Sequence, residues 1–258
     1  DDLFPEDYMV RIPIPDNYVG QQHFFLSDDD DSEHTINIDD HETMVPAKAK
    51  KDTPIHQLSD SLKEAIRVFV LSTAVRSSRG QSKSHSTMLV NVTHLTALQD
   101  KVDEFIGEYL DEIKNAIDLT AGFNVSKAIE RSLIISQLQG TFKRHYSNVS
   151  ESFDQLFNLL KPCVFKIQNL AVHSSSSNGK SLDYGAYKEN GLSVIVTGGH
   201  KLSRGLTLEG LTVSYFARNS KMYDTLMQMC RWFGYRPGYD DLCKLFITSE
   251  SHEWYTFI

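Results

Sequence analysis

Short apolar runs alternate with helical or polar segments between residues 163 and 248, and no other feature limits the possible fold as much. The predicted strands are residues 163–167, 192–197, 211–216 and 244–248, and a helix is predicted over 224–233. Short buried strands that alternate with helices form a mostly parallel sheet covered on both faces. The sequence therefore predicts an α/β fold, in which ligands bind beyond the carboxyl ends of the strands.

The preceding region is predicted to be mainly helical. Apolar residues recur at steps of three and four from 55 to 73, a polar loop follows near 76–83, and residues 87–92 are expected to form a buried strand. Further helical periodicity predicts a largely helical insertion over residues 94–160. Upstream, residues 1–25 are expected to be extended and residues 27–53 to form an acidic loop. Three segments follow from these patterns: 1–53, 54–162 and 163–258.

Composition indicates an intracellular globular protein. The chain has 258 residues, 40% of them hydrophobic, which is enough to bury a core. No apolar run approaches the roughly 20 residues that span a bilayer, and the N-terminus has no apolar signal core. Three cysteines without CxxC spacing indicate neither a disulfide framework nor a zinc site. We therefore expect a cytoplasmic protein with no membrane partner and no protein-bound metal.

The net charge of −8 conceals a basic region. Residues 27–42 carry eight acids and no Lys or Arg, and without them 26 acids balance 26 bases. Residues 198–236 carry six bases and two acids. A basic face that contacts a nucleic-acid backbone is therefore possible despite the acidic total. The candidate contacts are Arg76, Arg79, Lys83 and Lys201.

A partial phosphate-loop pattern at residues 178–181 fails. The sequence Asn-Gly-Lys-Ser matches the end of GxxxxGK[ST], but the first glycine of that pattern would be residue 174, which is Ser. Without that glycine, the backbone N–H groups cannot turn toward the phosphates in the usual way. We therefore interpret residues 178–181 as a surface loop.

Two blocks near the C-terminus carry the strongest functional signal. Residues 194–211 form a strand, a glycine-rich polar loop and a second strand; the alternative is a tight structural turn. In residues 224–239, Gln228 and Arg231 lie one helical turn apart, and Arg236 follows in the exit loop. Such a cluster suits phosphoryl transfer, which depends on positioning and charge neutralisation. The alternative is that Arg231 stacks on a neighbouring aromatic ring or pairs with an Asp.

These blocks resemble the fifth and sixth motifs of superfamily 2 helicases, which lie in the second RecA-like domain and face ATP bound to the first. The phrases GGHKLSRGLTLEGLTVSYFAR and YDTLMQMCRWFGYRPGYDDLCKLF are more closely similar to the Z-one domain, a helicase-associated family described as candidate endonucleases in bacterial restriction and defence loci. The phrases IPDNYVGQQHFF and HSTMLVNVTH also resemble that family. The resemblance implies a RecA-like sheet with residues 87–92 as the fourth-motif strand.

The resemblance implies particular roles for site residues. Arg204 and Gly205 match the Arg-Gly pair of the fifth motif, and Gly199 and Thr207 flank it as cofactor-binding positions, although Thr207 replaces the usual acid. Gln228, Arg231 and Arg236 match the sixth motif with altered spacing. This spacing leaves open which arginine reaches the γ-phosphate, and Arg231 is preferred because it is predicted to lie on the helix.

The implied function is that of the C-terminal, arginine-bearing half of an ATP-dependent DNA helicase or translocase, with bacterial restriction or phage defence as its setting. ATP and Mg²⁺ would be bound mainly by an N-terminal RecA-like domain, so the chain alone should be inactive. Other restriction or defence proteins are possible partners. The alternatives are an endonuclease component with a degenerate helicase core and a non-catalytic interaction module. No nuclease signature is recognised in the sequence.

Overall fold

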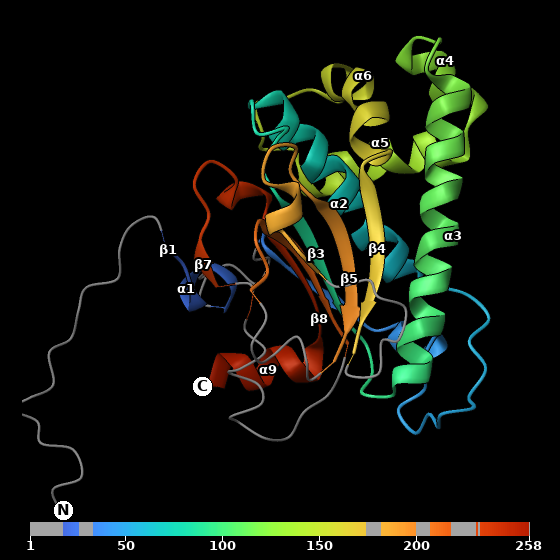
Figure 1. The fold of residues 1–258 in the computed structure, drawn as a ribbon, viewed down its shortest axis with the longest axis vertical. Coiled ribbons are helices and arrows are strands. Elements are labelled where there is room, and N and C mark those ends of the chain that lie inside the picture. The colour runs from blue at the N-terminus through green and yellow to red at the C-terminus, as the bar shows by residue number, and fades with distance from the viewer. Residues whose placement is uncertain are drawn as a thin grey trace, which may run out of the picture.

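The computed structural model describes residues 18–25, 33–173, 182–199, 207–217, 231 and 233–257. Within these ranges, six strands form one sheet in the order β2-β8-β6-β3-β5-β4, and every neighbouring pair is parallel (Figure 1). The strands are β2 (Thr35–Ile38), β3 (Ser86–Asn91), β4 (Ile167–Val172), β5 (Ser193–Gly198), β6 (Leu211–Phe216) and β8 (Lys244–Thr248). The predicted α/β fold with a mostly parallel sheet is confirmed. Strands β5 and β6 were predicted to lie in the same sheet, and both pair with β3.

The helical insertion predicted over residues 94–160 is also confirmed. It connects β3 to β4 and comprises α3 (Thr96–Thr120), α4 (Val125–Arg131), α5 (Leu133–His145) and α6 (Phe153–Val164). Side chains of Asn124, Ser132 and Ser152 cap the starts of the last three helices by accepting a backbone N–H. These caps explain why the insertion divides into short helices rather than continuing as one.

Helix α2 (Asp60–Ser78) begins and ends later than the sequence pattern indicated. It begins after Ser59, whose side chain caps it by accepting the N–H of Leu62. It continues through Arg76, which was expected in a loop, and Gly80 follows its end with φ +79°. A left-handed glycine just beyond the last turn is a common helix stop, so the glycine marks the end better than the preceding polar residues did.

Three other local predictions are wrong. Residues 163 and 164 end α6 instead of starting a strand, because the buried helical face that includes Leu160 continues past Pro162. The supposed acidic loop contains β2, whose Ile38 is buried where the strand pairs with β8. The supposed extended N-terminal segment contains the helix α1 (Gln21–Phe25).

A small second sheet lies beside the main one. Strand β1 (Tyr18–Val19) pairs antiparallel with β7 (Gly234–Tyr235), and so joins the start of the described chain to the segment before β8. The short 3₁₀ helices are η2 (His41–Thr43), η3 (Gly185–Tyr187) and η4 (Asp240–Leu242). None of the helices in the described ranges is long and apolar enough to cross a membrane.

The central strands are buried on both faces, as expected for parallel strands. Alternate residues such as Met88 and Ile195 point into the larger core, which also contains apolar residues of helices α2 to α6. Leu89 and Val196 point to the opposite face, where they pack with Tyr184 and its neighbours in a smaller cluster. Apolar side chains therefore cover both faces of the sheet, and functional groups are expected at the two ends of its strands.

All six strands point the same way, so their carboxyl ends share one edge, beside α9 (Ser249–Phe257), and their amino ends share the other (Figure 1). We call these the carboxyl edge and the amino edge. The connection after β3 leads toward β4, whereas the connection after β6 leads toward β8. The adjacent carboxyl ends of β3 and β6 therefore flank a topological switch point, where parallel sheets commonly bind ligands.

Candidate functional site

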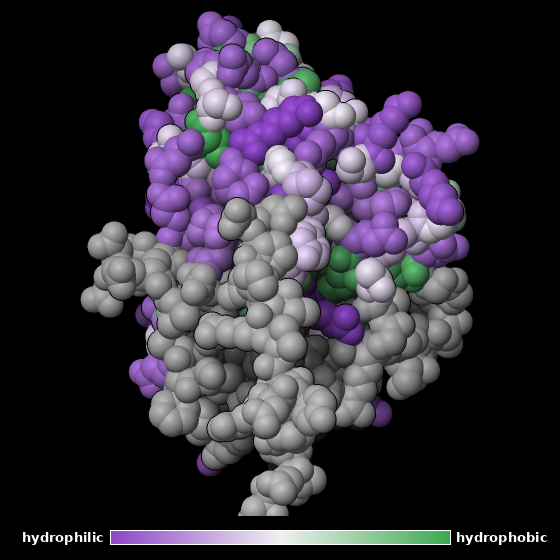
Figure 2. All heavy atoms as spheres, turned by 90° about the vertical axis from the view of Figure 1, so that its left-hand side faces the viewer, coloured by the Kyte–Doolittle hydropathy of each residue, from purple (hydrophilic) through white to green (hydrophobic). Residues whose placement is uncertain are grey.

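Two segments that carry predicted site residues meet at the amino edge. Residues 207–210 lead into β6 and residues 233–243 lead into β8, and these two strands are adjacent and parallel. Their amino ends must therefore lie side by side. Figure 2 shows that the described surface in the upper half of the molecule is largely hydrophilic, with small apolar patches. We call residues 231 and 233–243 the arginine loop.

Arg236 folds its guanidinium back over the arginine loop. Its Nη2 donates to the carbonyl oxygens of Arg231 and Phe233, both at 3.3 Å, and its Nη1 donates to the carbonyl of Tyr235 at 3.1 Å. Gly234, with φ +144°, leaves room for this path, because a Cβ there would lie 2.9 Å from Arg236 Nη1. These acceptors are neutral carbonyls, which hold a guanidinium less strongly than a carboxylate or phosphate does.

Arg231 lies in a turn, not on a helix. The preference for Arg231 over Arg236 rested on a helical position, so the structure removes the reason for it. Residues 224–230 of the helix predicted over 224–233, which include Gln228, lie outside the described residues. Arg204, Gly205 and Lys201 also lie outside them.

Arg76 joins the two segments of the amino edge. Only 3% of the residue is exposed. Its Nη1 donates to the carbonyl of His85 at 2.7 Å and lies 3.5 Å from the carbonyl oxygen of Gly210, and its guanidinium lies 4.1 Å above the ring of Tyr239. Burial lowers the pKa of Arg76 from its usual value. The prediction that Arg76 contacts a nucleic-acid backbone is therefore corrected: the side chain is enclosed by the protein.

Arg79 is also committed to internal contacts. It donates to the carboxylates of Glu151 and Asp241 at distances between 2.7 and 3.2 Å. Hydrogen bonds to these two carboxylates raise the pKa of Arg79 above its usual value. The prediction of a nucleic-acid contact is corrected here as well, because the donors already have anionic partners. Lys83 is exposed and keeps that predicted role.

The structure separates the two described cofactor-binding candidates. Gly199 follows β5 at the carboxyl edge, where a Cβ would come within 2.8 Å of Gln99 Nε2. Thr207 lies two residues before Glu209, whose carbonyl accepts the Thr87 hydroxyl at the amino edge. A six-residue strand is about 17 Å long, so these edges are distinct sites. Gly199 has a packing role against Gln99, and Thr207 lies in the segment that leads into β6 at the amino edge.

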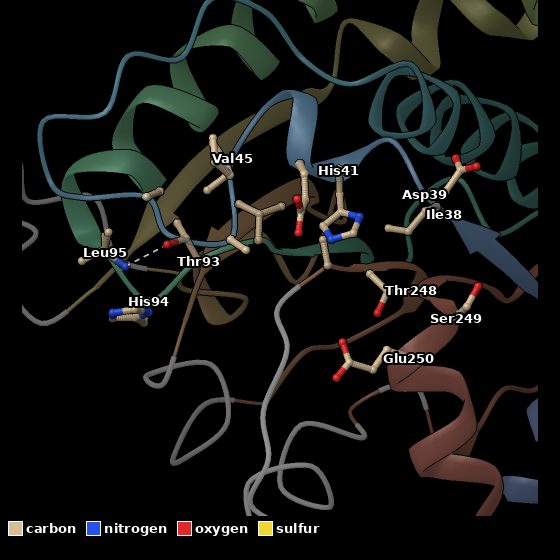
Figure 3. Close-up of a pocket in the computed structure, with 16 residues that line it drawn as sticks. Ile38, Asp39, His41, Val45, Thr93, His94, Leu95, Thr248, Ser249 and Glu250 are labelled. Carbon is tan, nitrogen blue, oxygen red and sulfur yellow. Dashed lines mark hydrogen bonds between the residues drawn. The ribbon is translucent and has the colours of Figure 1, made fainter.

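A pocket of about 530 Å³ lies at the carboxyl edge, at the switch point between β3 and β6 (Figure 3). The segments that follow β2, β3, β6 and β8 line it, including Asp39, His41, Glu42, His94 and Glu250. In Figure 3, His41 and Glu250 extend toward the space between these segments. Its described lining contains three carboxylates and no Lys or Arg, so its charge suits a neutral or cationic group better than a phosphate.

Sequence reasoning missed this pocket, although polar residues directly after three apolar strands were an available signal. It also missed Glu151 as the partner of Arg79 and Tyr239 as the partner of Arg76. Each partner lies far from its arginine in sequence, and only the fold brings the two together. Among the described residues, no group of three or more His, Cys, Asp or Glu side chains is placed to hold a metal ion.

Comparison with known proteins provides one assignment. The family model of the Z1 domain matches residues 61–258, which include the helical insertion, the arginine loop and five of the six described strands of the main sheet. No curated protein and no solved structure matches the chain. Because the match covers most of the sequence, the chain belongs to the Z1 domain family.

Proposed function

We propose that this chain is the arginine-bearing lobe of an ATP-dependent DNA helicase or translocase, with a RecA-like sheet. In this proposal, an N-terminal RecA-like domain of the same protein binds most of the ATP and Mg²⁺, and the arginine loop completes the site. The proposed setting is bacterial restriction or phage defence.

The supporting observation is the meeting of the two motif-bearing segments at one edge. Gly210, which precedes β6, and Tyr239 of the arginine loop are 29 positions apart in sequence, yet Arg76 contacts both: it lies near the Gly210 carbonyl and stacks on Tyr239. A nucleotide bound by a facing domain would therefore meet both segments together. Either segment alone would be compatible with a structural turn.

The groups at the amino edge fit a phosphate rather than a magnesium ion. Arg236 carries a planar guanidinium, a group suited to bidentate contact with phosphate oxygens, and in this structure it is folded onto its own loop. The described residues contain no cluster of three carboxylates or histidines for a metal. In the proposal, Arg236 exchanges its neutral carbonyl acceptors for the γ-phosphate and stabilises the charge that spreads over it during transfer.

The test is DNA-stimulated ATP hydrolysis by the intact protein and by two variants, Arg236→Ala and Arg231→Ala. Removal of an arginine that contacts the transferring phosphate typically lowers the rate about 10³–10⁵-fold. We expect this loss for Arg236→Ala, with a thermal melt close to that of the unchanged protein. Arg131→Ala is the control, because Arg131 is exposed on α4 and contacts the ring of Phe123.

The possible outcomes separate the assignments. If Arg231→Ala loses hydrolysis and Arg236→Ala keeps it, the role of Arg236 is wrong and the motor proposal stands. If both variants keep full hydrolysis, the nucleotide role of the arginine loop is wrong. Steady ATP turnover by this chain alone would contradict the proposed need for a second domain. Metal-dependent DNA cleavage would favour the endonuclease alternative.

One observation favours an interaction module as the second candidate. Leu119 and Leu133, on α3 and α5 of the helical insertion, are 79% and 74% exposed. Both lie near a cavity lined by residues from α3 to α5, and Leu119 lines it. A contiguous exposed apolar patch marks a protein-binding surface, and in this second proposal the two leucines belong to one. Loss of a co-purifying partner in a Leu119→Ser, Leu133→Ser variant with intact hydrolysis would show that the insertion adds binding to motor activity.

A further inference from the structure

Arg79 connects the helical insertion to the arginine loop. It follows the last residue of α2 and contacts one carboxylate from each of these regions. Its Nε lies 2.8 Å from Glu151 Oε1, in the segment between α5 and α6, and its Nη2 lies 2.7 Å from Asp241 Oδ2, in η4. The two carboxylates are 90 positions apart in sequence and meet on a single guanidinium.

The geometry of these contacts is specific to arginine. Nη1 and Nη2 both donate to the Asp241 carboxylate, at 2.8 and 2.7 Å, while Nε and Nη2 both donate to the Glu151 carboxylate, at 2.8 and 3.2 Å. Only a planar fork of donors serves two carboxylates in this way, and a lysine ammonium does not. The Arg79 contact also lowers the pKa of Glu151, which keeps this carboxylate charged.

Partial burial strengthens the connection. The side chains of Arg79 and Glu151 are 23% and 12% exposed, and Asp241 is 42% exposed. Water and salt therefore screen the Glu151 contact less than they screen an ordinary surface ion pair. Hydroxyls of Ser78 and Ser150 also donate to Glu151, and hold its carboxylate toward Arg79.

The same end of α2 holds the arginine loop at further points. Arg79 Nη1 donates to the carbonyl of Gly238 at 3.2 Å, and Gln81 Nε2 donates to the carbonyl of Pro237 at 3.3 Å. These acceptors directly follow Arg236. The path of the chain just after Arg236 is therefore set by side chains at the end of α2, and one of them, Arg79, is itself held by the helical insertion.

We infer that Arg79 is a positioning residue through which Glu151 of the helical insertion controls the placement of Arg236. The inference rests on the proposed function for its effect on hydrolysis, but the physical connection can be measured without it. A displacement of the segment around Glu151, for instance by a protein bound to the insertion, would loosen the arginine loop and slow the reaction.

The experiment compares Glu151→Gln and Asp241→Asn with the unchanged intact protein, by hydrogen exchange of a peptide covering residues 237–243 and by ATP hydrolysis. The control is Asp118→Asn, which removes the ion pair between α3 and α6 formed with Lys161 at 2.5 Å and does not touch the loop. We expect exchange in the loop to rise about tenfold in both test variants, since losing a charge-assisted bidentate contact frees the segment locally. The control should not change it.

Hydrolysis provides the second measurement. We expect both test variants to lower kcat while leaving KM nearly unchanged, because Arg236 acts mainly on the transition state. Arg79→Lys should behave like Glu151→Gln, since lysine cannot hold both carboxylates. Thermal melts check that each variant is folded.

The outcomes distinguish this inference from the proposed function. Unchanged exchange in folded Glu151→Gln would overturn the connection, whatever the hydrolysis rate. Faster exchange with an unchanged kcat would overturn the positioning role of Arg79. If the unchanged protein hydrolyses no ATP but the variants exchange faster, the motor proposal fails and the connection between insertion and loop stands.

Discussion

The guanidinium of Arg76 lies 4.1 Å above the ring centroid of Tyr239, in the interior of the amino edge. A second set of contacts holds the same side chain: Nε donates to Gln81 and Nη1 donates to Ser86, both at 2.8 Å. An arginine placed in this way joins α2, the start of β3 and the arginine loop. Its charged guanidinium interacts with groups inside the protein and not with solvent, because the residue is almost fully buried.

Replacing Arg76 with Ala should therefore destabilise the protein. We expect the free energy of unfolding to fall by about 2–3 kcal/mol, because buried acceptors lose their donor and a space is left over Tyr239. Urea unfolding monitored by circular dichroism measures the loss. A variant with unchanged stability and weakened DNA binding would instead restore the surface role that the sequence indicated.

Lys83 provides the contrasting case, because it is exposed. If the protein binds DNA through its backbone, affinity should fall steeply with salt, and Lys83→Ala should reduce the slope of log K against log salt by about 1. Lys201→Ala tests the other predicted lysine in the same titration. Binding that is flat across salt concentrations would rule out a backbone contact.

Gly210 should tolerate no side chain. Its φ is +65°, and a Cβ would lie 1.8 Å from the carbonyl oxygen of His85. We expect Gly210→Ala to lower the free energy of unfolding by about 2–4 kcal/mol, through the clash and the left-handed backbone. Gly122→Ala is the matched control, because a Cβ there meets nothing within 4 Å. Equal stability of the two variants in denaturant titrations would show that the strands separate easily at this edge.

Acid should weaken the N-terminal contacts of the sheet through His34. Its Nδ1 donates to the carbonyl of Cys243 at 2.9 Å, and burial lowers its pKa from 6.5 to about 4. Between pH 6.5 and 4, the unfolded chain binds a proton at this site that the folded chain excludes. The free energy of unfolding should therefore fall on acidification through this window, by a total on the order of 3 kcal/mol.

The measurement is chemical unfolding at several pH values for the unchanged protein and for His34→Gln, which cannot take up the proton. The variant should lose most of the dependence between pH 6.5 and 4. The ring of His23 contacts that of His34, with centroids 3.9 Å apart and a tilt of 35° between the planes. Burial lowers the pKa of His23 as well, so it should leave a smaller dependence of the same sign. Parallel curves for the two proteins would show that His34 is not the group responsible.

Several features of this protein could be predicted from the sequence because they depend on local patterns. The apolar runs at 211–216 and 244–248 predict buried strands, since such runs have few other stable environments. The periodicity after residue 94 predicts the helical insertion. Errors arose where a local signal was weak: β2 has four residues between acidic stretches, and it forms a strand because its backbone pairs with β8.

The candidate site was less accessible from the sequence. The two arginines of the sixth-motif resemblance could be recognised, but not the fact that Arg236 bends back onto its own loop. Arg76 and Arg79 were interpreted as surface charges because a sequence shows charge without burial. Their partners Tyr239, Glu151 and Asp241 lie 72 to 163 positions away in sequence.

The sequence by itself determined which segments could be strands and helices, because those preferences depend on hydrophobic periodicity, caps and glycines within a few residues. Only the tertiary structure decided which charges are exposed and which are enclosed. That decision depends on the order of strands in the sheet, which brings the starts of β6 and β8 together beside the end of α2. A guanidinium at this place lies within hydrogen-bonding or stacking distance of carboxylates, carbonyls and an aromatic ring. These neighbours, and not the residue type, decide that the charge is enclosed by the protein.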